Sequence, residues 1–144
     1  MKQLLIAATL IFLSACASTE FKAYEGNNKT FTGNGGTKTT VNGIDIWDTG
    51  SPPRKFIVLG IIDDRRGSGP IPMYQLNSDI AKKVIEAGGD AAIQISSDTK
   101  ITGYITNNNT TAYAFGNSVS AYGSGTISPV RKNYTRFAVI KYEP

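Results

Sequence analysis

The strongest pattern of apolar positions is a run of β-branched and aromatic residues at 55–62 (KFIVLGII). Such a run is typical of a strand that is buried on both faces. Further along, apolar residues recur at helical spacing from Leu76 to Ile85, with Ser78 as the expected N-cap, and Gly88-Gly89 ends the pattern. A short apolar run at 90–96 then predicts another strand. The segment 55–96 is therefore long enough for a parallel strand–helix–strand crossover.

The C-terminal third alternates apolar and polar residues with the period of a strand. Residues 100–106 predict one strand, Asn107–Asn109 a polar turn and 110–122 a second strand. Residues 123–132 are expected to be a longer connection, and the run at 134–142 (YTRFAVIKY) a final strand. Together with a short strand near 44–47, these elements predict an α+β fold, a small mixed sheet of about five or six strands with one main helix.

The loop expected at 63–72 (DDRRGSGPIP) separates the first strong strand from the helix. At the other end of the mature chain, 16–40 is polar, rich in Gly, Asn and Thr, and without sustained periodicity. It is interpreted as a flexible tether. The sequence therefore predicts a tether at 16–40 and a single small α+β domain at 41–144.

The N-terminus carries its own hydrophobic segment. Residues 4–13 are apolar, which is shorter than the ~20 residues that a membrane-spanning helix needs and matches the core of a secretory signal. The following Leu13-Ser14-Ala15-Cys16 resembles the lipobox of bacterial lipoprotein precursors. The resemblance implies that Met1–Ala15 is a signal peptide and that Cys16 is acylated as the first mature residue.

The residues after Cys16 indicate in which membrane the protein is anchored. Ala17-Ser18 stand where an Asp would resemble the inner-membrane retention signal of enteric bacteria. We therefore expect a lipid anchor in the outer membrane, with the protein facing the periplasm or, alternatively, the cell surface.

Composition excludes several chemistries. The chain has one Cys and no His, so it can form no intramolecular disulfide and lacks the usual ligands of zinc, copper and haem. No metal and no cofactor are expected. The formal net charge is +4, but the basic residues are scattered, whereas a nucleic-acid interface needs a basic stripe with stacking aromatics. No nucleic-acid partner is expected.

Candidate catalytic patterns are weak. Without His, a Ser-His-Asp site is impossible. Ser97-Asp98-Thr99-Lys100 matches the Ser-x-x-Lys pattern of penicillin-interacting enzymes, but it is expected in a turn between strands rather than at the start of a buried helix. Asp63-Asp64 could bind a hard cation, yet adjacent Arg65 and Arg66 are simpler partners. The sequence indicates that the protein is not an enzyme.

Four residues are candidates for partner binding: Trp47, Arg54, Arg65 and Arg66. Trp and Arg are enriched in binding hot spots, and Pro52-Pro53 would stiffen the segment between Trp47 and Arg54. If the segments 47–54 and 63–72 converge, they make an aromatic anchor with a charged rim on the surface. The alternative for Trp47 is burial in the core.

The stretch Ser78–Ser97 (SDIAKKVIEAGGDAAIQISS) resembles the core of YbjQ-type domains and, at the level of architecture, the envelope lipoprotein RcsF. The whole mature chain is similar to uncharacterised Gram-negative envelope lipoproteins. The resemblance implies oligomerisation through the sheet and carries no catalytic residue.

Two functions follow as expectations. The first is a non-enzymatic envelope lipoprotein that acts through protein contacts in the periplasm, as a homo-oligomer or as part of an envelope assembly. The alternative is a binding module for a small ligand, a glycan or a peptidoglycan fragment. An exposed sheet edge or apolar patch would favour the first, and a concave pocket lined by Tyr would favour the second.

Overall fold

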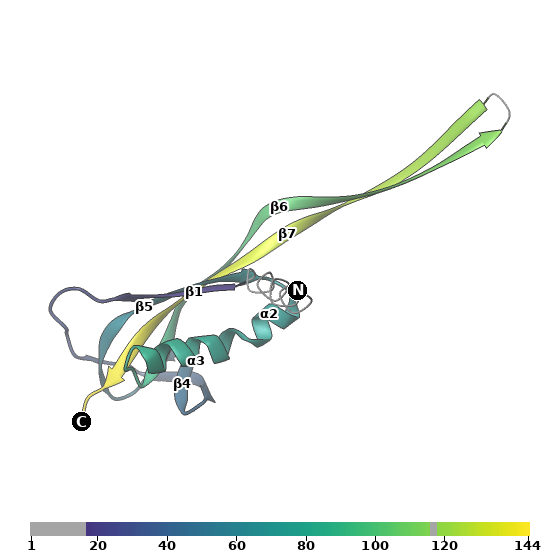
Figure 1. The fold of residues 1–144 in the computed structure, drawn as a ribbon. Helices are drawn as coiled ribbons and strands as arrows, with labels where there is room; N and C mark the ends of the chain where they lie inside the picture. The colour runs from purple at the N-terminus through teal and green to yellow at the C-terminus, as the bar shows by residue number, and fades with distance from the viewer. Residues whose placement is uncertain (1–16, 116–117) are drawn as a thin grey trace, which may run out of the picture.

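The structure is a computed structural model, and it describes residues 17–115 and 118–144. Within these residues one curled, mixed sheet of seven strands dominates the fold (Figure 1). The strands are β1 (Ala17–Ala23), β2 (Phe31–Thr32), β3 (Gly35–Val41), β4 (Ile44–Ser51), β5 (Lys55–Gly67), β6 (Ala91–Phe115) and β7 (Ser118–Tyr142). Their order is β1-β5-β7-β6-β4-β3, with the short β2 also paired to β5. Only β4 and β6 pair in parallel; the other described pairs are antiparallel.

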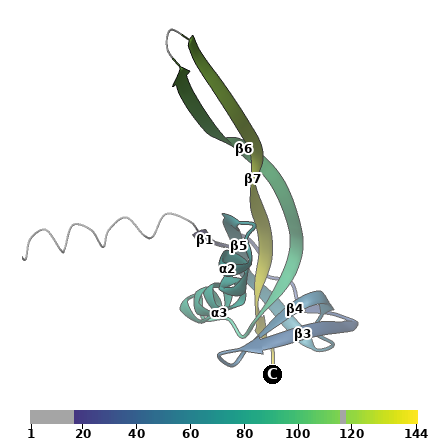
Figure 2. The ribbon, with the colours of Figure 1, turned by 90° about the vertical axis from the view of Figure 1, so that its right-hand side faces the viewer.

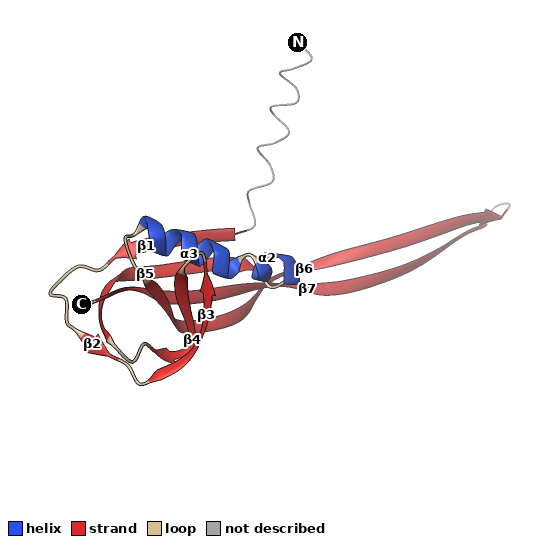
Figure 3. Cartoon of the chain, turned by 90° about the horizontal axis from the view of Figure 1, so that it is seen from below, coloured by secondary structure: helices blue, strands red, loops and turns tan. Residues whose placement is uncertain are grey.

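Two short helices cover one face of the sheet (Figure 3). Helix α2 (Pro70–Tyr74) leads directly into α3 (Leu76–Glu86), with Gln75 between them. Helix α3 buries Leu76, Ile80, Ala81 and Val84 against the sheet, which is the stripe that the apolar spacing predicts. Ser78 is not the N-cap; Gln75 occupies that position and makes no side-chain capping bond.

The core lies on both faces of the sheet because the sheet curls. The larger cluster, between the sheet and α3, contains Ile46, Ile62, Phe137 and Val139, each at most 1% exposed. The second cluster lies on the opposite face and gathers Trp47, Phe56, Ala91, Ala138 and Ile140. Strands β5 and β7 supply residues to both clusters, as expected for strands that are buried on both faces.

A long hairpin projects from this body (Figure 1, Figure 2). Strand β7 pairs with β5 only up to Lys132, and β6 pairs with β4 only at 91–93. Beyond these rows β6 and β7 pair only with each other among the described residues, from Ile101↔Arg131 to Phe115↔Ser118. We call residues 101–115 of β6 and 118–130 of β7 the arm.

The prediction of an α+β fold is wrong: the protein is mostly β, with two short helices on one curled sheet. Several expected turns and loops are strand. Residues 63–67 extend β5, the expected turn at Asn107–Asn109 lies within β6, and the expected connection at 123–132 lies within β7. Polar and Gly-containing segments were interpreted as loops, but a sheet that faces solvent tolerates them because only the backbone must pair.

The expected crossover also differs in detail. Strands β5 and β6 run parallel, but β7 lies between them. The final strand of the chain therefore inserts into the centre of the sheet. The parallel neighbour of β6 is β4 instead, through Asp45↔Ala91 to Trp47↔Ile93.

The segment predicted as a tether, 16–40, holds most of three strands instead. Strand β1 pairs with β5 from Ala17↔Arg66 to Ala23↔Gly60, and β3 forms an antiparallel pair with β4. Thr, Lys and Gly suit these strands because both β1 and β3 lie at an edge of the sheet, where one face or both meet water. Within the described residues, the chain is therefore paired into the sheet from Ala17 onward.

Candidate functional site

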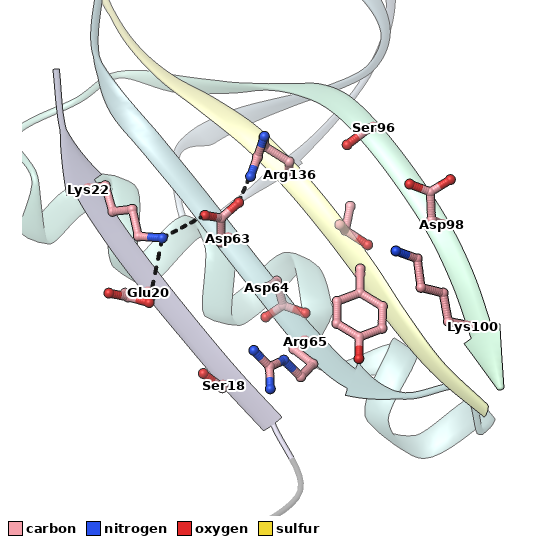
Figure 4. Close-up of a pocket in the computed structure, with 12 residues that line it drawn as sticks. Ser18, Glu20, Lys22, Asp63, Asp64, Arg65, Ser96, Asp98, Lys100 and Arg136 are labelled. Atoms are coloured by element: carbon pink, nitrogen blue, oxygen red, sulfur yellow. Dashed lines mark hydrogen bonds and ion pairs between the residues drawn. The ribbon is translucent and has the colours of Figure 1, made fainter. Parts of the chain in front are cut away.

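A shallow charged groove crosses the sheet on the face opposite the helices (Figure 4). It has a volume of about 350 Å³. Its floor is made by the middle of β1, β5, β7 and β6, whose alternate residues point to this face. The charged side chains that point into it are the acidic Glu20, Asp63 and Asp98 and the basic Lys22, Arg65, Lys100 and Arg136.

Asp63 is the most strongly paired charge in the groove. Arg136 Nε donates to Asp63 Oδ1 at 2.6 Å, and Lys22 Nζ donates to Asp63 Oδ2 at 3.1 Å. The hydrogen bond from Arg136, assisted by the one from Lys22, lowers the pKa of Asp63, and partial burial opposes this only in part. A carboxylate held ionised in this way is a poor general base at neutral pH. The groove can accept a polar ligand, but its geometry offers no activated nucleophile.

Arg65 and Tyr134 form the aromatic part of the groove. The guanidinium carbon of Arg65 lies 5.6 Å from the centre of the Tyr134 ring, and Lys100 Nζ lies 5.5 Å from the same centre. Both cations are exposed, which makes them cation–π contacts of modest strength. Arg65, one of the four predicted contact residues, is thus on the surface as expected.

Arg66 is not on the surface. Its side chain is 1% exposed and makes a bidentate pair with Asp64, with Nε and Nη2 each 2.5 Å from a carboxylate oxygen. It also donates to Asp79 Oδ2 at 3.1 Å and to the Pro72 carbonyl at 2.8 Å. The hydrogen bonds to Asp64 raise the pKa of Arg66 above its usual value. The interpretation of Arg66 as a surface contact residue is therefore corrected: this cluster ties β5 to α2 and α3.

The same cluster holds the first strand. Thr19 Oγ1 on β1 donates to Asp64 Oδ2 at 2.6 Å and lies 3.4 Å from Arg66 Nη2. The sequence predicts a loop at 63–72, in which Arg66 would be exposed. In the structure the alternation of a strand divides these residues, so that Asp63 and Arg65 face the groove while Asp64 and Arg66 face the helices.

Trp47 and Arg54 lie far from the groove residue Arg65. Trp47 is 7% exposed and belongs to the second core cluster. Its burial supports the alternative interpretation, in which Trp47 is a core residue. Arg54 is exposed and stacks on Tyr142, with its guanidinium carbon 4.1 Å from the ring centre. Arg54 directly precedes β5, whereas Arg65 lies near the far end of that strand, about 30 Å away at ~3.3 Å per residue. The two segments do not converge into one patch.

The arm is the most unusual feature of the described chain. The sequence predicts strands at 100–106 and 110–122 but no continuous hairpin of this length. Its sequence contains no Asp, Glu, Lys, Arg or His from Ile101 to Val130. The absence of charge over two adjacent strand-like segments was the signal available. Lys100 precedes this stretch, and Arg131-Lys132 follow it.

The base of the arm exposes apolar side chains. Ile127 is 70% exposed, Tyr104 66%, Ile105 55% and Ile101 51%. Both long edges of the arm present backbone groups that no described strand pairs. A two-stranded hairpin is marginally stable by itself in water, and charged or Pro residues normally guard such edges against pairing with another chain. Here Pro129 is the only such residue between 101 and 130.

Neither a metal site nor a membrane-spanning helix is found among the described residues. No group of three or more Cys, Asp or Glu side chains within 17–115 and 118–144 could hold a metal ion. Over the same ranges no helix has the length and apolar character to cross a bilayer. Cys16, the predicted lipidation site, lies outside the described residues, immediately before Ala17.

Comparison with known proteins gives no relative on which to base a function. No protein-family model, no curated protein and no solved structure matches this chain significantly. The function must therefore be argued from the geometry of the groove, the buried cluster and the arm.

Proposed function

We propose that this protein is a non-enzymatic lipoprotein of the bacterial outer membrane, anchored through Cys16 and facing the periplasm, whose copies associate through their arms. The anchor is supported by the resemblance of Leu13–Cys16 to a lipobox. Two or more acyl chains anchor a protein stably, because each buried methylene contributes about 0.8 kcal/mol.

The single observation that carries the proposal is the pair of free edges on the uncharged arm. An edge strand recognises another strand through its backbone groups, so an extended, unguarded edge is a template for pairing. Identical arms suit each other because no charge between Ile101 and Val130 would repel its counterpart. Pairing would also bury the exposed Ile101, Ile105 and Ile127 at least in part.

The charged groove supports the second candidate, a binding module for a polar ligand, less well. Tyr134 and Arg65 could stack on a sugar or a peptide. However, Asp63 is already paired with Arg136 and Lys22, so a charged ligand would have to compete with these bonds. Only one Tyr lines the groove, whereas the arm supplies two long unpaired edges.

The test uses the single cysteine of the chain. When Cys16 is acylated, a cysteine introduced elsewhere is the only free thiol. In the native envelope, Thr106→Cys on the arm should give a product of twice the protomer mass with a short bis-maleimide crosslinker. The matched control is Ser78→Cys on α3, another exposed hydroxyl position, which should stay monomeric.

Each outcome bears on a separate part of the proposal. Intact-mass analysis of the membrane-extracted protein should show loss of Met1–Ala15 and the mass of acyl chains; an unmodified thiol at Cys16 would disprove the anchor. Crosslinks of Thr106→Cys only to other proteins would show that the arm binds a different partner. No crosslink at all from Thr106→Cys would show that the arm is not a contact element.

A further inference from the structure

The arm and the predicted anchor leave the body at the same end of the sheet. Ala17, at the start of β1, pairs with Arg66, which in turn pairs with Asn133 of β7, and Asn133 pairs with Thr99 of β6. These four residues form one row across the sheet, and the arm begins within two residues of it. Figure 1 shows the start of β1 at the side of the body from which β6 and β7 project.

This row places the acyl anchor close to the arm. Neighbouring strands are about 4.8 Å apart, so Ala17 lies roughly 10 Å from β7 and roughly 15 Å from β6. Cys16 is bonded to Ala17, and consecutive Cα atoms are about 3.8 Å apart. Strand β1 runs away from the arm, so the chain before Ala17 enters the sheet from the arm side. An acyl anchor at Cys16 would therefore place the membrane at this end.

Exposed apolar side chains gather at this same end. Of the ten large apolar residues that are exposed in the described chain, four lie on the base of the arm. Two more, Ile71 at 76% and Tyr74 at 88% exposure, lie on α2. Helix α2 is held beside the arm because Asn133 Nδ2 donates to Met73 Sδ at 2.9 Å and Ser68 N donates to the Arg131 carbonyl at 3.3 Å.

Basic residues surround the point where the uncharged stretch begins. Lys100 pairs with Lys132 across the hairpin, Ile101 pairs with Arg131, and the exposed Arg65 lies opposite Tyr134 on the neighbouring strand. Asp98 is the acidic exception at this level, while Asp79 is already paired with Arg66. Basic residues near a bilayer favour anionic headgroups.

From this arrangement we propose that the anchor end of the protein docks on the lipid bilayer, with Ile71 and Tyr74 at its surface and the uncharged arm entering it. The arm is long enough, because residues 101–115 span about 50 Å at ~3.3 Å per residue while the hydrocarbon layer is about 30 Å thick. Unpaired backbone groups are costly in hydrocarbon, so arm pairing between copies and entry into lipid reinforce each other. The inference rests on the anchor proposed above.

The experiment places a fluorophore on the arm of the lipidated protein. Thr106→Cys is labelled at its single free thiol and reconstituted into vesicles of phosphatidylethanolamine and phosphatidylglycerol that include lipids with a nitroxide on the acyl chain. The nitroxide should quench the Thr106 label by more than half. The label on Ser78→Cys, on the outer side of α3, should lose less than a tenth of its emission.

Two apolar substitutions give a matched comparison in the protein without acyl chains, Cys16→Ser. Removing one Ile side chain from contact with lipid should lower the vesicle partition coefficient about tenfold. We expect a loss of that size in Ile127→Asp. Ile85→Asp is the control, because Ile85 is a similarly exposed Ile, at 53%, on the last turn of α3 and away from the arm. Circular dichroism confirms that both variants fold.

The outcomes separate this inference from the proposed function. If Thr106→Cys crosslinks between copies but its label is not quenched by nitroxide lipids, the arms pair outside the membrane and the docking proposal is wrong. Equal loss of partitioning in Ile127→Asp and Ile85→Asp would likewise overturn it. Quenching at Thr106 without crosslinks would support the lipid contact and count against self-association.

Discussion

Arg66 donates two hydrogen bonds of 2.5 Å to the carboxylate of Asp64, at a place where the two side chains are at most 1% exposed. The pair is two residues apart on the helix-facing side of β5. Removing one partner of a buried ion pair leaves the other charge without compensation, which is much more costly than the pair is stabilising. The integrity of this pair is therefore a sensitive test of the fold.

Arg66→Ala should lower the free energy of unfolding by about 3–5 kcal/mol, because Asp64 stays buried and unpaired. Arg65→Ala is the control: it removes the neighbouring guanidinium, which is exposed, and should cost less than about 1 kcal/mol. Urea denaturation followed by circular dichroism measures both. Similar midpoints for the two variants would mean that Arg66 is on the surface after all.

Gly60→Ala should detach or distort β1. A Cβ atom at Gly60 would overlap the carbonyl oxygen of Lys22 and the ring of Phe21, and overpacking of this kind costs about 1–3 kcal/mol. Gly103→Ala is the matched control, since a Cβ there meets nothing within 4 Å. Hydrogen exchange of the β1 amides should rise in Gly60→Ala alone; unchanged protection would contradict the pairing of β1 with β5.

The Asp63 interactions predict a stability that depends on pH. Because Arg136 and Lys22 lower the pKa of Asp63 in the folded protein, its contribution is fully present above the unfolded pKa of about 3.9 and is lost as the pH falls through the folded pKa. Asp63→Asn should cost at most about 1 kcal/mol at pH 7, since Arg136 and Lys22 are more than half exposed. The difference should vanish near the acid limit and shrink in concentrated salt.

Thermal unfolding at several pH values measures this difference. Asp98→Asn, in the same groove but without an ion pair among the described residues, should show no comparable change with pH. A stability loss in Asp63→Asn that stays constant down to the lowest pH would show that packing, and not charge, is responsible.

The buried parts of the fold were the most predictable from sequence. The run at 55–62, the helix around Ile80 and the strand at 134–142 all lie in the elements expected. Each carries a hydrophobic pattern, because each is covered by another layer. Val139, on the last strand, is fully buried.

The elements that the sequence does not predict are held in the sheet by backbone hydrogen bonds rather than by a buried apolar face. Residues 17–23 are polar, so no apolar period distinguishes them from a loop, yet their backbone groups pair as a strand. In the arm the alternation predicts strands at 100–106 and 110–122, but the polar 107–109 and the Gly-containing 123–132 also pair as strand. The DDRR segment was misread for a related reason. From sequence alone, a charged residue at position 66 is expected to be exposed to solvent. Its burial becomes understandable only in the structure, where Asp64, Asp79 and the Pro72 carbonyl surround it.

The pairing of β1 along β5 has a mechanical consequence. A load applied at Cys16 would act along the axis of β1, and it would be shared by the seven residue pairs from Ala17↔Arg66 to Ala23↔Gly60 at once. Strands loaded lengthwise must break their bonds together, whereas strands pulled apart from one end lose them one at a time. Thr19 adds side-chain hydrogen bonds to Asp64 and Arg66 to this strand pairing. If Cys16 carries the proposed lipid anchor, this pairing would keep the protein folded under a pull from the membrane.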